Sequence, residues 1–397
     1  MNRDPMTFDV VIAGAGLAGS SLALRLAEAG ARVGLADPGV FPREKLCGEY
    51  LSPEGAAVLD RLGMLPDLER RGSRPIDRVR LTTPRGRSLA AKVTGDDARP
   101  GLGLSRATLD DHLINECRRA GVTVMEQTRV AGPILEDGRV AGVRARCANH
   151  EPLDLLATVT IAANGRHSSL VRETGTTRAR GFSRPGLFGL KRHYACSDLD
   201  ASEPDGTVGL HLVPGGYIGA CRIDGGLINV CGLLPEAILK QYRGDLDRLA
   251  DEHFAANPVL DRLIKSSSPT SPWKTVAGVR VEVSTPKIPG ILYAGDCQGT
   301  VDPLGGQGMT MALLGAEMLA PVALSALHLG EANHRLQQAH QAAWRRRFDG
   351  RIRLCRLFHH MLINPWLIDA AAVSGTIAPR LLTACFQMTR DRSIVAS

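Results

Sequence analysis

A glycine-rich segment near the start of the chain constrains the fold more than any other stretch. Residues 8–13, Phe-Asp-Val-Val-Ile-Ala, predict a short buried strand, and Ser20–Glu28 is rich in helix-forming residues. Between them, Gly14, Gly16 and Gly19 have G-x-G-x-x-G spacing. Gly14 permits a tight turn, Gly16 lets a pyrophosphate approach the backbone, and Gly19 lets the helix pack closely on the strand. The helix N-terminus then offers N–H groups and a partial positive charge to phosphates.

The residues that follow this helix complete a β-α-β unit. A second apolar strand, Arg32–Ala36, ends at Asp37. Asp37 lies about 20 residues beyond the glycine motif, where a carboxylate accepts hydrogen bonds from an adenosine ribose. A β-α-β unit that binds no ligand is the alternative, but the strand, the glycine spacing and the acidic residue agree. We therefore predict a dinucleotide site.

Length and composition limit the remaining possibilities. The 397 residues suffice for two domains, and 44% hydrophobic with 22% charged residues is typical of globular proteins. No uninterrupted run of 18 apolar residues occurs and the N-terminus is polar, so we expect no transmembrane segment, no secretory signal and a cytoplasmic location. Nine cysteines without a C-x-x-C pair indicate reduced thiols and no metal site. The net charge of +7 comes without a nucleic-acid-binding motif, so we expect no nucleic-acid partner.

The middle of the chain changes character and predicts a second domain with an antiparallel sheet. Four stretches read as its strands: 187–195, 208–213, 217–223 and 227–233. Residues 76–95 alternate apolar and polar around Pro84-Arg85-Gly86, which predicts a hairpin. Residues 235–266 are expected to be helical. The serine- and proline-rich residues 266–272 are expected to cross back to the first domain.

A second glycine-rich loop occurs far along the chain. Residues 302–309, Asp-Pro-Leu-Gly-Gly-Gln-Gly-Met, lead into an apolar helix from Thr310 to about Leu329. NAD alone does not explain two glycine-rich helix N-termini. Reduced flavin has a second anionic region, its N1/C2 carbonyl edge, which a helix opening at residues 306–309 would stabilise. Asp296, in the turn before this loop, would then bind the ribityl chain between the two halves of FAD.

Together these motifs resemble the FAD-dependent family that includes para-hydroxybenzoate hydroxylase, geranylgeranyl reductases and flavin-dependent halogenases. The resemblance covers about residues 8–325 and includes residues 43–48, Arg106 and Ala163-Asn164-Gly165 besides the two loops. It implies an α/β fold with a Rossmann-like FAD-binding domain, an antiparallel β-sheet substrate domain and C-terminal helices. The expected boundaries are 1–75, 100–180 and 275–330 for the FAD-binding domain, 76–99 and 181–274 for the substrate-binding domain, and 331–397 for the C-terminal helical region.

The resemblance also implies which residues contact FAD. Asp37 would hold the adenosine ribose, and Val130 would line the adenine pocket. Arg43 and Arg106 would lie near the pyrophosphate and ribityl region, and Cys47-Gly48 would run beside the isoalloxazine. The full set of expected FAD-binding residues is Gly14, Gly16, Leu17, Ala18, Gly19, Asp37, Arg43, Cys47, Gly48, Arg106, Val130, Gly295, Asp296, Pro303, Gly306, Gln307, Gly308 and Met309.

Two departures from the family's patterns bear on the reaction. The hydroxylases have Asp-Gly where this chain has Asn164-Gly165, and their Asp helps to bind FAD and NAD(P)H. Electrons from NAD(P)H would therefore arrive either directly or through a separate flavin reductase. The halogenases carry a Trp-x-Trp-x-Ile-Pro signature, and none of Trp273, Trp344 and Trp366 lies in that pattern, so we do not expect halogenation.

The function that the resemblance implies is an FAD-dependent monooxygenase of secondary metabolism. A flavin C4a-hydroperoxide formed with O₂ would hydroxylate or epoxidise an apolar aromatic or polyketide-like substrate in a closed apolar cavity. Residues 43–48 (Arg-Glu-Lys-Leu-Cys-Gly) and Pro214-Gly215-Gly216-Tyr217 resemble the geranylgeranyl reductase branch most. An FAD-dependent ene-reductase is therefore the first alternative. A flavin-binding protein without turnover is the second.

No catalytic acid or base can be assigned from the sequence. Cys47, His193, His211 and Tyr217 are candidates because they fall on the expected flavin loop or on the expected substrate sheet. Lys191 and His193 are two residues apart on a strand and so share one face, which either orients a substrate or faces solvent.

An arginine cluster near the C-terminus suggests a partner. Arg345, Arg346, Arg347, Arg351, Arg353 and Arg356 alternate with Trp344, Phe348, Ile352 and Cys355 at helical spacing. A helix with a solvated basic face is one interpretation. A docking face for an acyl carrier protein or an anionic lipid is the other.

Overall fold

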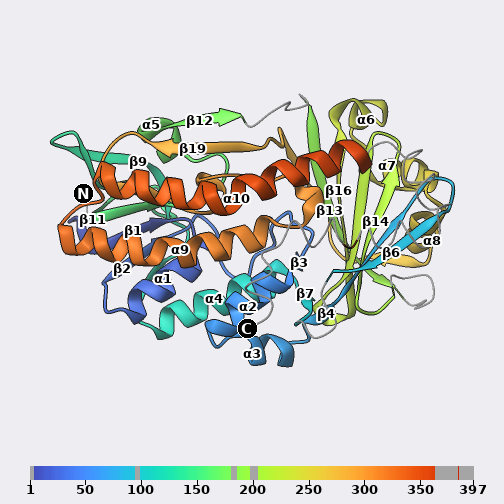
Figure 1. The fold of residues 1–397 in the computed structure, drawn as a ribbon, viewed down its shortest axis with the longest axis horizontal. Helices are drawn as coiled ribbons and strands as arrows, with labels where there is room; N and C mark the ends of the chain where they lie inside the picture. Colours follow the sequence, from blue (N-terminus) through green and yellow to red (C-terminus); the bar gives the residue numbers. More distant parts are fainter. Residues whose placement is uncertain (1–3, 94–98, 180–185, 197–203, 363–382, 384–397) are drawn as a thin grey trace.

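The computed structural model describes residues 4–93, 99–179, 186–196, 204–362 and 383. Two β-sheets dominate it, and Figure 1 shows them at opposite ends of the molecule, with helices α9 (Gly308–Leu329) and α10 (His334–Leu362) running lengthwise. The predicted α/β fold, with a Rossmann-like part and an antiparallel sheet, is confirmed. The part of the C-terminal region beyond residue 362, apart from residue 383, lies outside the described residues.

The first sheet is mostly parallel and carries the first glycine motif. Its strand order is β8-β2-β1-β11-β10-β9, and β20 also pairs with β11. The strands are β1 (Met6–Ala13), β2 (Val33–Ala36), β8 (Thr123–Met125), β9 (Arg129–Glu136), β10 (Arg139–Arg146), β11 (Pro152–Ala162) and β20 (Ile291–Tyr293). Strands β9 and β10 form an antiparallel hairpin, whereas β1 is parallel to both β2 and β11. The expected β-α-β unit is therefore present, with α1 (Leu17–Glu28) as its helix.

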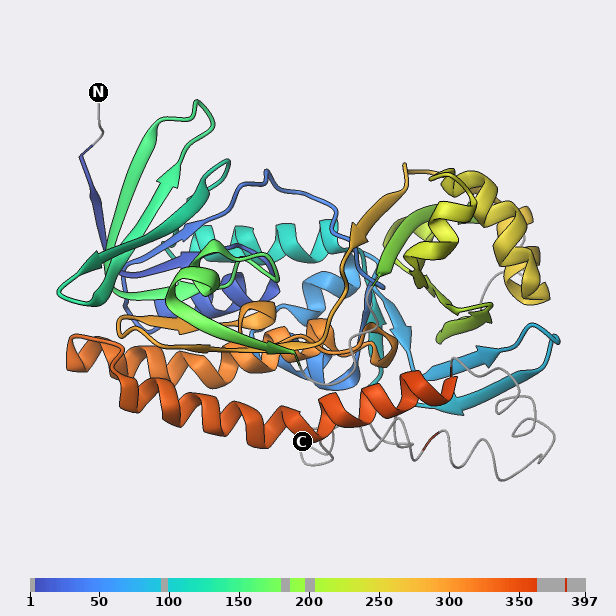
Figure 2. The same ribbon diagram turned by 90° about the horizontal axis from the view of Figure 1, so that it is seen from above.

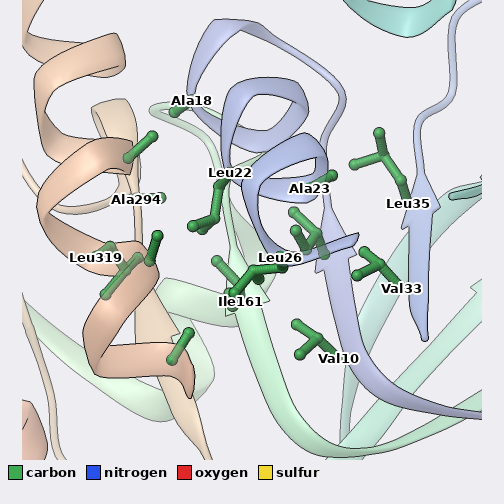
Figure 3. Packing of buried hydrophobic residues seen from close by; sticks show 14 of the residues in the cluster. Val10, Ala18, Leu22, Ala23, Leu26, Val33, Leu35, Ile161, Ala294 and Leu319 are labelled. Atoms are coloured by element: carbon green, nitrogen blue, oxygen red, sulfur yellow. The ribbon is translucent and has the colours of Figure 1, made fainter. Parts of the chain in front are cut away.

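The core of this half lies between the sheet, α1 and α9. Figure 3 shows Leu22 and Leu26 of α1, Ile161 of β11 and Leu319 of α9 gathered there, and all four side chains are fully buried. By length and composition alone α9 could cross a membrane, but 56% of its most apolar stretch is buried inside the protein. Its contacts with α1 and α10 identify it as a core helix.

The second sheet is the predicted antiparallel one. Its order is β17-β13-β16-β15-β14-β5-β6, with β18 also beside β13. The strands are β5 (Arg78–Thr82), β6 (Ser88–Lys92), β13 (Leu187–Cys196), β14 (Thr207–Val213), β15 (Gly216–Arg222), β16 (Leu227–Pro235), β17 (Ser267–Pro269) and β18 (Lys274–Ala277). Helices α6 (Glu236–Gln241), α7 (Leu246–His253) and α8 (Pro258–Lys265) gather on one side of it (Figure 2). The hydrophobic residues of α7 and α8 pack on β13, β15 and β16, so the other face is turned toward the half that carries the first glycine motif.

One boundary expectation needs correction. Residues 266–272 do not leave the second sheet, because β17 pairs with Tyr194–Cys196 of β13 and β18 pairs with Phe188–Lys191. The chain returns to the first half only after Ala277. Serine and proline suggested a linker, but a short edge strand tolerates them because one of its sides makes no ladder hydrogen bonds.

Shorter elements complete the fold. A small sheet of β3 (Tyr50–Leu51), β4 (Arg74–Ile76) and β7 (Gly101–Gly103) lies near α2 (Pro53–Arg61), α3 (Leu65–Arg70) and α4 (Arg106–Arg119). Strand β12 (Gly175–Ala179), which follows α5 (Ser169–Thr174), pairs with β19 (Glu282–Pro286).

Candidate functional site

A cavity of about 580 Å³ lies between the two halves. Gly16, Leu17 and Ala18 of the first glycine motif line it, and so do Pro303 and residues 305–306 and 308–309 of the second glycine loop. The opposite wall comes from the antiparallel sheet. One cavity therefore joins both predicted glycine-rich loops.

The glycines of the first motif have distinct surroundings. A Cβ on Gly14, whose φ is +103°, would lie 2.5 Å from the Ala163 carbonyl oxygen, and a Cβ on Gly19 would lie 1.8 Å from that of Gly14. These two positions need glycine because backbone packs against backbone. A Cβ on Gly16 would instead face the cavity, 3.7 Å from the Lys45 ammonium and 4.0 Å from the Arg106 guanidinium.

Positive charge gathers at this corner of the cavity. Arg106 is buried and donates two hydrogen bonds to the carboxylate of Asp110, at 2.7 and 2.8 Å. Lys45 extends into the cavity, and its ammonium has no hydrogen-bond partner within the described residues. The protein around the cavity desolvates the Lys45 ammonium and lowers its pKa, and repulsion from Arg106 lowers the pKa further, although attraction to Asp296 raises it. An anion bound beside Gly16 would relieve this repulsion.

The adenosine end of the expected site is organised by Asp37. Its carboxylate accepts hydrogen bonds from the backbone N–H groups of Ala15 and Gly39, both at 2.8 Å, and from Arg43 at 2.9 Å. Asp37 and Arg43 therefore bind each other, and neither lines the cavity. Val130 lies in β9, also away from the cavity.

The second glycine loop turns sharply into α9. Gly306 has φ +60°, in the left-handed region that favours glycine, and α9 begins at Gly308. Gly295 and Asp296 border the cavity as well. Gln307 does not, because its side chain is fully buried and its Oε1 accepts a hydrogen bond from Arg351 of α10 at 3.0 Å. The Gln307 side chain therefore points away from the cavity, and the expected contact of Gln307 with FAD stays a prediction for its backbone N–H.

The segment of residues 45–48 borders the cavity along its length. The Cys47 thiol lies 3.2 Å from the Met309 sulfur, which joins this segment to the start of α9. Gly48 is exposed, and a Cβ there would meet no atom within 4 Å. We call this stretch the cofactor segment because it lies between the two glycine-rich loops.

The sheet wall of the cavity is neutral. The strand pairing places residues of β13, β16, β15 and β14 side by side in three rows: Gly189–Leu233–Tyr217–Leu212, Lys191–Cys231–Gly219–Leu210 and His193–Asn229–Cys221–Val208. From these rows the cavity is lined by Gly189, Leu233, Tyr217, Cys231, Gly219, Leu210, Cys221 and Val208. Burial raises the pKa of the Tyr217 hydroxyl well above its usual value, so the phenol stays neutral.

The four candidate catalytic residues separate into two pairs. Cys47 and Tyr217 line the cavity. His193 does not, because its Nε2 lies 2.6 Å from Glu49 in a buried cluster. His211 is also buried away from the cavity, where its Nδ1 lies 2.8 Å from the Thr82 hydroxyl. Sequence reasoning missed Lys45, whose only hint was a second cation in the stretch of residues 43–48.

The arginine cluster is not a continuous basic face. Arg351 is buried between Glu54 (2.9 Å) and Gln307. Only Arg346 and Arg353 of the six arginines are exposed. Trp344, Phe348, Ile352 and Cys355 are buried against the body of the protein, as the helical spacing predicted.

One group of side chains has the composition of a metal site. Ligand atoms of Asp67, His112 and Glu116 lie within 4.8 Å of one another on α3 and α4. Arg70 already binds Asp67, and Arg119 binds Glu116. Two nearby guanidinium groups disfavour a divalent cation there. Every cysteine that the structure describes is a free thiol.

Comparisons with known proteins agree with this geometry. A family model described as a FAD binding domain matches residues 7–349. The chain is 26% identical over 352 residues to a digeranylgeranylglycerophospholipid reductase of Methanoculleus marisnigri, covering 85% of this chain and 82% of that protein. It is 28% identical over 378 residues to a 6-methylpretetramide 4-monooxygenase of Streptomyces rimosus, covering 91% and 86%.

The fold also matches solved structures. A myxobacterial chondrochloren halogenase, described as an FAD-dependent halogenase, superposes with a TM-score of 0.79 at 22% identity, covering 99% of this chain and 96% of that one. At this identity the likeness shows the fold alone.

Proposed function

Because the chain belongs to the FAD binding domain family of oxidoreductases, we propose that it is a monooxygenase that hydroxylates or epoxidises a compact apolar aromatic, polyketide-like substrate. The observation that carries this proposal is the neutral sheet wall beside the two glycine-rich loops. Apolar and small side chains exclude water there and offer no charge to a polar substrate. The monooxygenase relative of Streptomyces rimosus supports the same reaction class.

The residues around the cavity fit FAD. Gly16 leaves room for a pyrophosphate at the N-terminus of α1, and Lys45 faces that space without a partner within the described residues. Asp296 would bind the ribityl hydroxyls, and residues 306–309 would meet the flavin ring with the N-terminus of α9. When bound, FAD supplies the redox chemistry and the activation of O₂.

The protein itself binds and orients the substrate and keeps water out of the cavity. The cofactor segment and the second glycine loop form one wall, and the rows of the antiparallel sheet form the other. Tyr217 is the phenol of the sheet wall, and because it stays neutral it can donate a hydrogen bond to a substrate carbonyl or hydroxyl.

Electrons would come from NAD(P)H directly. Arg166, His167 and Arg280 line the cavity, and within the described residues none of them has an acidic partner. Unpaired cations at a cavity mouth attract a phosphate-bearing molecule. Delivery through a separate flavin reductase is the alternative.

An ene-reductase is the second candidate, because the reductase relatives match the chain over a similar length. The cavity of about 580 Å³ must also admit part of the cofactor, and this favours a compact substrate over a long isoprenoid chain. The two functions differ in their need for O₂.

The deciding experiment uses the full chain reconstituted with FAD. Anaerobic mixing with NADPH tests direct reduction, which bleaches the yellow flavin band. If the band persists until a flavin reductase is added, electrons reach FAD through that reductase. The reduced protein is then mixed with 6-methylpretetramide and O₂, and separately with a geranylgeranyl lipid without O₂. We expect an oxygenated product only in the first mixture. Saturation of the lipid would establish the reductase, and a flavin that no donor reduces would indicate a binding protein without turnover.

A further inference from the structure

Glu49 is buried at the point where the cofactor segment ends. Its side chain is fully buried, and its backbone has φ +54°, in the left-handed region that residues other than glycine seldom adopt. The Oε1 atom accepts hydrogen bonds from Lys191 Nζ at 2.6 Å and from the Arg106 backbone N–H at 2.8 Å. The Oε2 atom lies 2.6 Å from His193 Nε2, and since a carboxylate can only accept, the histidine nitrogen is the donor.

The same face of the sheet also binds the backbone of the segment. Lys191 Nζ donates to the carbonyl oxygen of Lys45 at 3.2 Å, and Asn229 Nδ2 donates to that of Cys47 at 3.0 Å. Lys191, His193 and Asn229 belong to β13 and β16, and each is at most 4% exposed. These side chains therefore attach the cofactor segment to the substrate sheet.

Stability alone does not explain this cluster. An apolar cluster of similar volume would hold the segment at least as strongly, because two buried charges lose their hydration. A hydrogen-bonded network differs from apolar packing in that its bonds form in one arrangement only. Neighbouring positions on the same strands, Gly189 and Cys231, line the cavity. The cluster thus lies between the wall for the substrate and the segment beside the cofactor.

We propose that Glu49, Lys191 and His193 are positioning residues that hold the cofactor segment in fixed register with the substrate sheet. Lys191 and Asn229 then set where the backbone of residues 45–47 lies, and Glu49 fixes the end of the segment against the start of α4. Displacement of the segment would move Lys45 and Cys47 relative to both glycine-rich loops. This inference rests on the proposed function, because it assumes that FAD occupies the cavity.

The test is a double substitution that removes both charges and keeps the shape. In Glu49→Gln/Lys191→Met no buried charge is left without its partner, so the fold is expected to persist. Arg192→Met is the matched control, because Arg192 lies on the same strand with its side chain on the other face, bound to Asp247. The measurements are the Kd for FAD by fluorescence titration, the visible spectrum and midpoint potential of the bound flavin, and the melting temperature.

We expect the double variant to bind FAD at least tenfold more weakly, with shifted flavin absorption and potential, while Arg192→Met behaves as wild type. An unchanged FAD Kd, spectrum and potential in the double variant would overturn the proposal, whatever its melting temperature. If the double variant does not fold, His193→Phe takes its place in the test, because this substitution keeps the Glu49–Lys191 pair. We expect the Kd of His193→Phe for FAD to rise threefold or more. A wild-type chain that takes up no FAD would refute the proposed function instead.

Discussion

The ammonium nitrogen of Lys45 lies 3.7 Å from the point that a Cβ atom on Gly16 would occupy. The glycine leaves the space open, and the lysine supplies a positive charge at its edge. Arg106 lies near the same point, but its charge is already balanced by Asp110. Lys45 is therefore the cation most available to a pyrophosphate.

Lys45→Met is expected to weaken FAD binding roughly 10- to 100-fold, because a hydrogen bond to a charged group contributes about 1.5–3 kcal/mol. A fluorescence titration with FAD measures this, and raising the salt concentration should weaken the wild type more than the variant. Lys265→Met, at an exposed position of α8, removes the same charge away from the cavity and should change nothing. Equal Kd values for wild type and Lys45→Met would show that Lys45 does not contribute to FAD binding.

Gly219 forms the recess at the centre of the sheet wall, between Cys231 and Leu210. A Cβ there would lie 3.2 Å from the Cys231 carbonyl oxygen, so alanine fits after a small shift. The methyl groups of Gly219→Val would enter the cavity. We expect Gly219→Val to bind FAD normally and 6-methylpretetramide at least tenfold more weakly, with Gly219→Ala between it and wild type. Perturbation of the flavin spectrum reports both affinities, and an unchanged affinity of Gly219→Val for this probe would place the substrate elsewhere.

Arg280→Ala tests the route of the electrons. If the unpaired cations at the cavity bind the phosphates of NADPH, the concentration of NADPH for half-maximal reduction should rise roughly tenfold or more. The FAD content should stay the same. Stopped-flow bleaching of the flavin band under anaerobic conditions measures the effect, with Arg353→Ala, at an exposed position of α10, as the control. Normal reduction of the variant would show that Arg280 does not take part.

Much of this site follows from local patterns in the sequence. Glycine spacing predicts both turns because Gly14 and Gly306 adopt positive φ angles that other residues avoid. Alternation predicts the sheet strands because its period is a property of the strand itself. The shared face of Lys191 and His193 was predicted for the same reason.

The residues that pack against Lys191 and His193 could not be predicted from the sequence. Glu49 lies 142 residues from Lys191 in the sequence, and a single glutamate in a loop has no periodic pattern. The direction of the Gln307 side chain was not predictable for a similar reason. Its neighbours in the glycine loop suggested the cofactor, but Arg351, from a helix 44 residues further on, determines the direction of its side chain.

Arg351→Met tests how α10 is attached to the second glycine loop. Arg351 is buried and binds both Glu54 and Gln307, so its loss removes a cation from a buried carboxylate. Breaking such a pair costs about 3–5 kcal/mol of unfolding free energy. Urea denaturation measures it, and Arg351→Met/Glu54→Gln should recover part of the loss because both charges are gone. Arg353→Met, exposed on the same helix, should stay within about 0.5 kcal/mol of wild type.

His340 makes the stability of the protein depend on pH. Burial lowers the pKa of His340 to about 4, against an ordinary value of 6.5, and its Nε2 lies 3.1 Å from Gln298 Oε1. Between these two values the unfolded chain binds a proton that the folded protein does not. The part of the unfolding free energy that comes from a neutral His340 is therefore fully present above pH 6.5 and is lost as the pH falls toward 4. Between pH 7 and 5 the loss amounts to about 2 kcal/mol. Urea denaturation at the two pH values should therefore show a smaller acid destabilisation for His340→Gln than for wild type, while His328→Gln, at an exposed position of α9, keeps the wild-type dependence. If His340→Gln loses as much stability on acidification as wild type, the folded protein accepts the proton at His340 and the histidine is not held neutral by burial.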